Sequence, residues 1–266
     1  MKINIVFFTS TGNTLYLALR AKYFFEKAGH RIGLFDVVNS RYDEIISCDA
    51  LGIFYPVWMS NMPDHLQVFC NLLLKEQNKK DLFIIGNCAT GADTSPNFWK
   101  NKLIKSGHRV HYTAILKMPS NCNISVLAKD TSESQISDFK KDSVNKLQEI
   151  CKDLLSDVNK YLPGAGISNL YALQRFFFFL KNKFAYKYLR LVNHRCSRCY
   201  LCVRLCPVNN IKLGYDNFIS FGEKCILCAK CFNFCPEKAI CIGKKSEDFQ
   251  KYRRYVCKEV KPLFYR

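Results

Sequence analysis

The chain has 266 residues, of which 48% are hydrophobic and 23% are charged. This mixture is that of a folded protein, so it excludes a wholly disordered chain, and the length allows one large domain or two smaller ones. Forty lysines and arginines against 22 aspartates and glutamates give a formal net charge of +18.

The sequence has 15 cysteines and no expected membrane span. No charge-free apolar run reaches the roughly eighteen residues that a spanning helix needs. The short apolar start, MKINIVFF, leads into a polar loop and does not resemble a signal peptide. We therefore expect a cytoplasmic protein whose cysteines are metal ligands or buried side chains and form no disulfides.

Strands and helices alternate over the first 160 residues. Apolar runs of strand length predict strands at Lys2–Phe8, Ile32–Val38, Leu51–Tyr55, Leu82–Gly86 and Val110–Leu116. Apolar residues at helical spacing predict helices at Thr14–Ala28, Pro63–Gln77, Asn97–Lys105 and Glu133–Val158. This alternation indicates a parallel sheet covered by helices on both faces, and such sheets bind ligands beyond the carboxyl ends of their strands.

The loop after the first strand is a candidate phosphate site. Its residues are Thr9, Ser10, Thr11, Gly12, Asn13 and Thr14. Hydroxyl groups, an amide and a glycine at a helix N-terminus suit a phosphate dianion. The loop lacks the lysine of a P-loop and the glycine pattern of a dinucleotide-binding fold. The alternative is a turn of serines and threonines that only caps the helix.

From Thr9 to Thr14 this loop resembles, residue for residue, the T/S-x-T-G-x-T phosphate loop of flavodoxins. The resemblance implies a doubly wound α/β domain over residues 1–160, with five parallel strands in the order 2-1-3-4-5 and FMN as cofactor. In flavodoxin-like proteins the loops after the third and fourth strands hold the flavin ring. The implied ring contacts are Pro56, Val57, Trp58 and Met59 in one loop and Asn87, Cys88, Ala89, Thr90 and Gly91 in the other.

Trp58 is the candidate for stacking on the flavin, and an aromatic side chain at the edge of the core is the alternative. The backbone amides from Asn87 to Gly91 are candidates for the pyrimidine edge of the ring. A third loop, Lys117–Cys122, is placed to cover the flavin.

Residues 161–192 form an expected linker. The stretch Leu162–Gly166 marks the end of the first domain, because proline and glycine interrupt the helical pattern. The following segment has a helical apolar face made of Leu170, Leu173, Phe177, Leu180, Phe184 and Leu191. We expect this helix to pack against one or both domains. A basic amphipathic helix on a membrane surface is the alternative.

Eight cysteines form two runs with one shared spacing, C-x2-C-x2-C-x3-C-P. The first run is Cys196, Cys199, Cys202 and Cys206, and the second is Cys225, Cys228, Cys231 and Cys235. Zinc also takes four thiolates, and a zinc-binding interaction module is the alternative interpretation. Zinc ribbons usually pair two C-x2-C knuckles, however, and do not require a third cysteine and a Cys-Pro in each run.

Over residues 193–243 the doubled run resembles the bacterial two-cluster ferredoxins. Three thiolates within seven residues can surround three irons of one cubane, but the chain cannot then turn back to the fourth iron. The resemblance implies that the fourth cysteine of each run ligates the other cluster. One [4Fe–4S] cluster would be held by Cys196, Cys199, Cys202 and Cys235, and the other by Cys225, Cys228, Cys231 and Cys206. Cys241 and Cys257 lie outside the pattern and are expected to be buried, and residues 244–266 form a C-terminal extension.

The whole chain is therefore similar to the flavodoxin–ferredoxin fusion proteins of anaerobes. The resemblance implies electron transfer between two [4Fe–4S] clusters and FMN, which links one-electron carriers to a two-electron partner. A flavin-dependent reductase of a quinone, nitro compound or other small acceptor is the alternative. No catalytic acid, base or nucleophile stands out.

The expected cofactors lower the positive charge of the protein. Each oxidised cluster with its four thiolates carries about −2 and the FMN phosphate about −2, which leaves the loaded protein at roughly +12. An acidic redox partner protein fits this charge. Nucleic acid is not an expected partner, because the sequence shows no nucleic-acid-binding motif.

Overall fold

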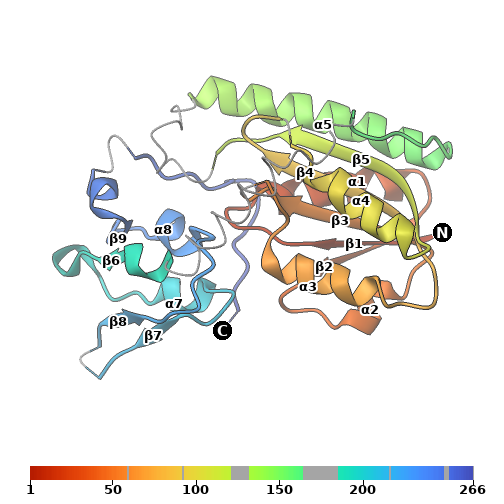
Figure 1. The fold of residues 1–266 in the computed structure, drawn as a ribbon. Coiled ribbons are helices and arrows are strands. Elements are labelled where there is room, and N and C mark those ends of the chain that lie inside the picture. Colours follow the sequence, from red (N-terminus) through yellow and green to blue (C-terminus); the bar gives the residue numbers. More distant parts are fainter. Residues whose placement is uncertain are drawn as a thin grey trace. The chain divides into compact units, whose positions relative to one another are not determined.

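The computed structural model describes residues 1–58, 60–91, 93–120, 132–163, 185–215, 217–248 and 252–265. Met59, Cys122 and the expected helical face from Leu170 to Phe184 lie outside these ranges. The chain divides into two units, each drawn in Figure 1. The first unit comprises residues 1–9, 13–119 and 132–163. The second comprises residues 10–12, Ser120 and the described residues from 185 onward.

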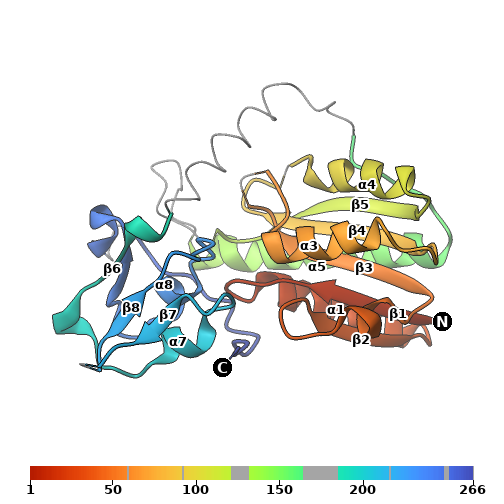
Figure 2. The same cartoon turned by 60° about the horizontal axis from the view of Figure 1, so that its bottom comes forward.

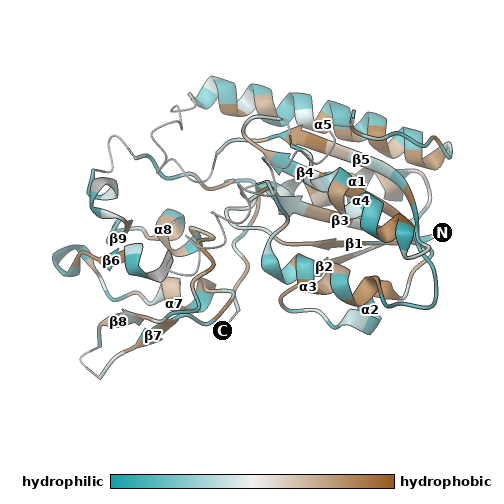
Figure 3. Ribbon diagram, viewed as in Figure 1, coloured by the Kyte–Doolittle hydropathy of each residue, from teal (hydrophilic) through white to brown (hydrophobic). Residues whose placement is uncertain are grey.

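Five parallel strands form the centre of the first unit. They are β1 (Lys2–Phe7), β2 (Arg31–Asp36), β3 (Ala50–Pro56), β4 (Asp81–Cys88) and β5 (Arg109–Lys117). Their order is β2-β1-β3-β4-β5, and all neighbouring pairs are parallel. This is the expected flavodoxin-like order, which is thereby confirmed. The central strands are almost entirely buried because helices cover both faces, and Figure 3 shows the hydrophobic colouring of these strands.

The helices of this unit are α1 (Asn13–Lys27), α2 (Tyr42–Ile46), α3 (Asp64–Leu73), α4 (Ser95–Lys105) and α5 (Glu133–Leu155). Helix α1 connects β1 to β2, which lies beside β1 toward one edge of the sheet. Helices α3 and α4 connect β3 to β4 and β4 to β5, and these steps run toward the opposite edge. Right-handed crossovers therefore place α1 on one face and α3 with α4 on the other. Helix α5 packs beside α1 (Figure 2).

One element boundary near the expected flavin loops differs from the sequence prediction. The fourth strand continues through Asn87 and Cys88, which pair with Leu116 and Lys117 of β5. The prediction ended this strand at Gly86, where glycine usually weakens a strand. In the structure a Cβ at Gly86 would lie 2.5 Å from the Cδ1 atom of Ile115, so close packing between the strands requires the glycine.

Helix α2 was not predicted, because its five residues are too few to show a helical period. A buried side chain from the sheet holds it in place. The Nδ2 group of Asn4 donates to the carbonyl of Ile45 at 2.8 Å.

The second unit is small and mixed, as the expected α+β ferredoxin domain requires. Its strands are β6 (Leu189–Leu191), β7 (Ile211–Leu213), β8 (Ile219–Phe221) and β9 (Ile240–Ile242), and its α-helices are α7 (Leu201–Leu205) and α8 (Lys230–Phe234). Short 3₁₀ turns occupy Ala185–Tyr188, Asn193–Arg195 and Lys244–Glu247. Strand β6 pairs with β9 and β7 pairs with β8, both antiparallel.

Among the described residues every cysteine is free. Cys241 and Cys257 are buried, which confirms the prediction for these two side chains. Within the described ranges, no helix combines the length and the apolar character needed to cross a membrane.

Candidate cofactor sites

The carboxyl ends of β1, β3, β4 and β5 meet at one edge of the parallel sheet. Backbone hydrogen bonds continue past the strand ends there. The N–H of Phe8 donates to the carbonyl of Phe54 at 3.2 Å, and the N–H of Val57 donates to the carbonyl of Asn87 at 2.9 Å. The loops that the sequence singled out therefore begin from neighbouring strands. This edge is the usual ligand position in doubly wound sheets.

The loop from Thr9 to Thr14 leads from β1 into α1. All six residues are buried, although five are polar and the sixth is glycine. Gly12 has a φ of +103°, a conformation that glycine adopts without strain, and α1 begins at the next residue. The hydroxyl oxygens of Ser10 and Thr11 are buried and have no hydrogen-bond partner among the residues that the structure describes.

Buried hydroxyl groups without partners are rare, because an unmade hydrogen bond costs about 1–3 kcal/mol. Here two of them flank the N-terminus of a 15-residue helix, whose first N–H groups also lack partners within the helix. The loop therefore fits an anion with several acceptor oxygens. The loop itself contains no lysine or arginine.

Side chains from other strand ends hold this loop in shape. The Nδ2 group of Asn13 donates to the carbonyl of Pro119, beyond β5, at 2.9 Å. The Nδ2 group of Asn87 donates to the hydroxyl of Thr14 at 2.8 Å and to the carbonyl of Tyr55 at 3.1 Å. Asn87 was expected to offer its backbone amide to the flavin ring. Its side chain fixes the end of the phosphate loop, and its backbone lies near the end of β4.

The two expected ring loops lie where their strands end. Trp58 and Asn61 exchange two backbone hydrogen bonds of 2.8 Å, which makes a tight turn beyond β3. The half-buried Trp58 ring contacts Phe8 edge-to-face, with the ring centres 5.4 Å apart. Pro56 is the last residue of β3, and Val57 follows it half-buried. Met59 lies outside the described residues.

In the loop after β4, exposure increases away from the strand. Cys88 is half-buried, and its sulfur lies 3.3 Å from the hydroxyl of Thr90. Ala89 and Thr90 are exposed, and Gly91 turns the chain with a φ of +73°. This loop has surface available to a planar ligand.

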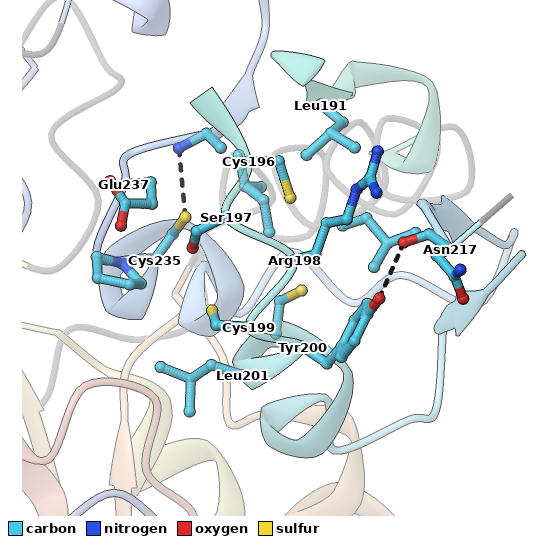
Figure 4. Close-up of a pocket in the computed structure, with 15 residues that line it drawn as sticks. Leu191, Cys196, Ser197, Arg198, Cys199, Tyr200, Leu201, Asn217, Cys235 and Glu237 are labelled. Atoms are coloured by element: carbon cyan, nitrogen blue, oxygen red, sulfur yellow. Dashed lines mark hydrogen bonds between the residues drawn. The ribbon is translucent and has the colours of Figure 1, made fainter. Parts of the chain in front are cut away.

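The second unit has two pockets that are each lined by four cysteines. The first cysteine pocket, of about 400 Å³ including its open mouth, contains Cys196, Cys199, Cys202 and Cys235 (Figure 4). The second cysteine pocket, of about 390 Å³, contains Cys225, Cys228, Cys231 and Cys206. Each pocket thus combines three cysteines of one run with the last cysteine of the other run.

The two runs fold in the same way locally. Tyr200 and Ala229 have φ values of +56° and +55°, and each immediately precedes one of the five-residue helices α7 and α8. After each run, the N–H of the residue four positions on donates to the last sulfur: Asn210 to Cys206 at 3.1 Å, and Ala239 to Cys235 at 3.2 Å. Such N–H···S bonds are typical of cysteines that ligate iron–sulfur clusters.

The pKa values of the pocket cysteines reflect their crowding. Burial raises the pKa of Cys202 to about 12, and the neighbouring Cys235, Cys199 and Cys196 add to the rise. Burial also raises the pKa of Cys231 well above its ordinary value, with Cys228, Cys225 and Cys206 contributing. For Cys202 and Cys231, the largest charge effects on the pKa come from cysteines of the same pocket. Four neighbouring thiolates repel one another, so they need a positively charged partner, and iron would supply that charge.

The arrangement of the sulfurs suits a group larger than one ion. Among the described residues, no three histidine, cysteine, aspartate or glutamate side chains converge closely enough for a single metal ion. The sulfurs instead stand around the walls of their pockets. A cubane of four irons offers one iron to each of four separated thiolates.

Sequence reasoning missed the part of the C-terminal extension that covers this unit. The guanidinium of Arg254 donates to the carbonyls of Phe232, Lys238 and Ile240. The N–H of Tyr265 donates to the carbonyl of Arg204, at the end of α7, at 2.8 Å. No local pattern marks these contacts, because their partners lie many residues away.

Parts of the chain are similar to known proteins. Residues 194–240 match the model of the 4Fe-4S dicluster domain. Among solved structures, the chain is similar to a flavodoxin of Megasphaera elsdenii, with 21% identity, a TM-score of 0.43 and coverage of 56% of this chain and 97% of that one. It is also similar to a flavodoxin of Streptococcus pneumoniae TIGR4, with 14% identity, a TM-score of 0.44 and coverage of 59% and 100%. No curated protein matches the chain. The chain thus carries a 4Fe–4S dicluster domain after a sheet of flavodoxin-like strand order.

Asn87 provides a test of how the phosphate loop is supported. Replacing Asn87 by Leu leaves the Thr14 hydroxyl and the Tyr55 carbonyl without their donor, so we expect the free energy of unfolding to fall by about 1–3 kcal/mol. Both tryptophans lie in the first unit, so urea unfolding followed by tryptophan fluorescence reports on that unit alone. The control is Asn101→Ala on the exposed side of α4, which should change stability by no more than about 0.5 kcal/mol. Equal stabilities of the two variants would contradict the assigned role.

Proposed function

We propose that the protein is an electron-transfer iron–sulfur flavoprotein, with FMN at the Thr9–Thr14 loop and two [4Fe–4S] clusters in the two cysteine pockets. The observation that carries the proposal is the composition of the two cysteine pockets. Each holds four cysteines, three from one run and one from the other, within the segment that matches the 4Fe-4S dicluster domain. This composition supports the crossed ligand sets implied by the spacing of the cysteines.

The cluster residues have distinct tasks. Cys196, Cys199, Cys202 and Cys235 would hold one cluster, and Cys225, Cys228, Cys231 and Cys206 the other. The N–H groups of Asn210 and Ala239 stabilise the thiolate form of the sulfur that each run gives to the other pocket. Ile211, Ile219 and Ile240 pack around these sulfurs and exclude water from them.

The phosphate loop supports FMN as a ligand of this protein. The unpartnered hydroxyls of Ser10 and Thr11 can donate to phosphate oxygens, and so can the N–H groups at the start of α1. Thr14 already accepts a hydrogen bond from Asn87, which leaves its own proton free to point at the phosphate. Trp58 and the exposed loop from Ala89 to Gly91 are the candidates for the flavin ring.

FMN exchanges one or two electrons and an iron–sulfur cluster exchanges one, so a protein with both can connect one-electron carriers to a two-electron partner. We infer that this exchange serves anaerobic metabolism in the cytoplasm. The net positive charge favours an acidic redox protein as the partner, because complementary charge speeds encounter.

Cofactor content gives the most direct test. After anaerobic reconstitution with iron, sulfide and FMN, the full chain should contain eight irons and one FMN. Iron analysis, zinc analysis and absorption spectra measure this. Stoichiometric zinc or only about four irons would refute two clusters, and a lack of bound FMN would refute the flavin assignment separately.

The crossed ligand sets predict which cluster each cysteine supports. Replacing Cys206 by Ala should remove the cluster held mainly by Cys225, Cys228 and Cys231, and replacing Cys235 by Ala should remove the other one. Mössbauer and EPR spectra of the two variants should therefore show complementary losses. Cys241→Ala is the control, because this buried cysteine lines neither pocket. Loss of each run's own cluster would show that the sets are not crossed.

The phosphate loop predicts a specific loss of FMN affinity. Replacing Ser10 or Thr11 by Ala removes a hydroxyl that binds a charged group, worth about 1.5–3 kcal/mol, or roughly ten- to a hundredfold in Kd. Fluorescence titration measures the affinity. Riboflavin, which has no phosphate, should bind equally to the wild type and both variants. An unchanged Kd for FMN would rule out the loop as the phosphate site.

A further inference from the structure

The two cysteine pockets differ in charge at three equivalent positions, and the charged side chain is buried at only one of them. In the first run Leu201 lies between Cys199 and Cys202, and in the second Lys230 lies between Cys228 and Cys231. Each is the first residue of its short helix, directly after a residue of positive φ. Each also lines its own pocket. The structural repeat therefore places a leucine at one site and a lysine at the other.

Lys230 is almost completely buried, with 1% of its surface exposed. Its ammonium donates to the carbonyl of Leu263 at 3.3 Å and to the hydroxyl of Tyr265 at 3.1 Å. The ammonium also lies 4.3 Å from the centre of the Tyr265 ring, at cation–π distance. The end of the chain thus covers the lysine and separates it from solvent.

Burying a cation costs several kcal/mol unless negative charge compensates it. A cluster with four thiolates carries about −2, so the loaded second pocket supplies that charge.

The other charged groups near the pockets do not produce the same asymmetry. The first pocket is lined by Arg198 and Glu237, which are both exposed and of opposite sign. The guanidinium of Arg198 lies over the ring of Phe218 at 4.3 Å. Arg254 is half-buried, and its interactions include both Cys235 of the first pocket and Cys231 of the second. Among the described residues that line the pockets, Lys230 is the only buried cation.

We propose that Lys230 sets the order in which the two clusters are reduced, by raising the reduction potential of the cluster held by Cys206, Cys225, Cys228 and Cys231. Reduction adds one electron and makes the cluster more negative, so a buried positive charge beside it stabilises the reduced form. The first electron from an external reductant therefore stays on this cluster. The inference rests on the proposed function, because it requires both pockets to be loaded.

The test is a redox titration of the reconstituted full chain with dithionite, followed by EPR. In Lys230→Met, which keeps the unbranched stem, the equilibrium constant for reducing the upper-potential cluster should fall at least tenfold, or about 59 mV for one electron. The lower midpoint should stay in place. The control Lys224→Met removes an exposed lysine just before the same run and should move neither midpoint.

A second variant places the charge at the other pocket. Leu201→Lys should raise the lower midpoint toward the upper one. The single-cluster variants assign the midpoints: Cys235→Ala should retain the upper one and Cys206→Ala the lower one. If Lys230→Met fails to bind eight irons, the lower midpoint potential of Leu201→Lys tests the inference in its place.

Three results would overturn the inference. They are unchanged midpoints in a fully loaded Lys230→Met protein, a shift of the lower midpoint instead of the upper, and an unchanged lower midpoint in Leu201→Lys. A wild-type protein with fewer than eight irons would refute the proposed function and this inference together. Iron analysis shows that result before any potential is measured.

Discussion

A cysteine run with two-residue spacers can approach a cubane from one side only, and the folding of the second unit follows from this limit. Each pocket is completed by a cysteine from the other run, so neither half of the unit can form a site alone. The strand pairs also help to bring the two cysteine runs together. Strands β7 and β8 connect the two runs, and β6 and β9 join the segments before the first run and after the second.

Cysteines form part of the described apolar core of this unit. One group of buried residues consists of Leu189, Ala229, Phe232 and Ile242, and the other of Cys206, Ile211, Ile219 and Ile240, with further cysteines packed against both. Domains of this size usually need metals or disulfides, because they bury too little apolar surface. The free cysteines exclude disulfides among the described residues. Cofactor binding and folding are therefore coupled in the second unit, whereas the first unit has a complete sheet core.

The sequence was informative where function depends on local spacing. The cysteine runs and the Thr9–Thr14 loop follow from patterns within a few residues, and the parallel sheet follows from the alternation of elements, whereas the strand order came from the resemblance to flavodoxins. Contacts between distant residues were not predictable. Asn87 lies 73 residues from Thr14, and Lys230 lies 35 residues from Tyr265. The strand end at Gly86 was misjudged because its requirement for glycine comes from Ile115 on the neighbouring strand.

The position of a charge matters more in this protein than the number of charges. A net charge of +18 acts on partners through solvent, where salt screens each surface charge beyond about 8–10 Å. Lys230 is one of 40 basic residues, yet burial removes the screening between its ammonium and the adjacent pocket. Composition can therefore suggest which partners approach the protein. The distribution of electrons inside it depends on one side chain, which becomes influential only because the distant C-terminal segment covers it.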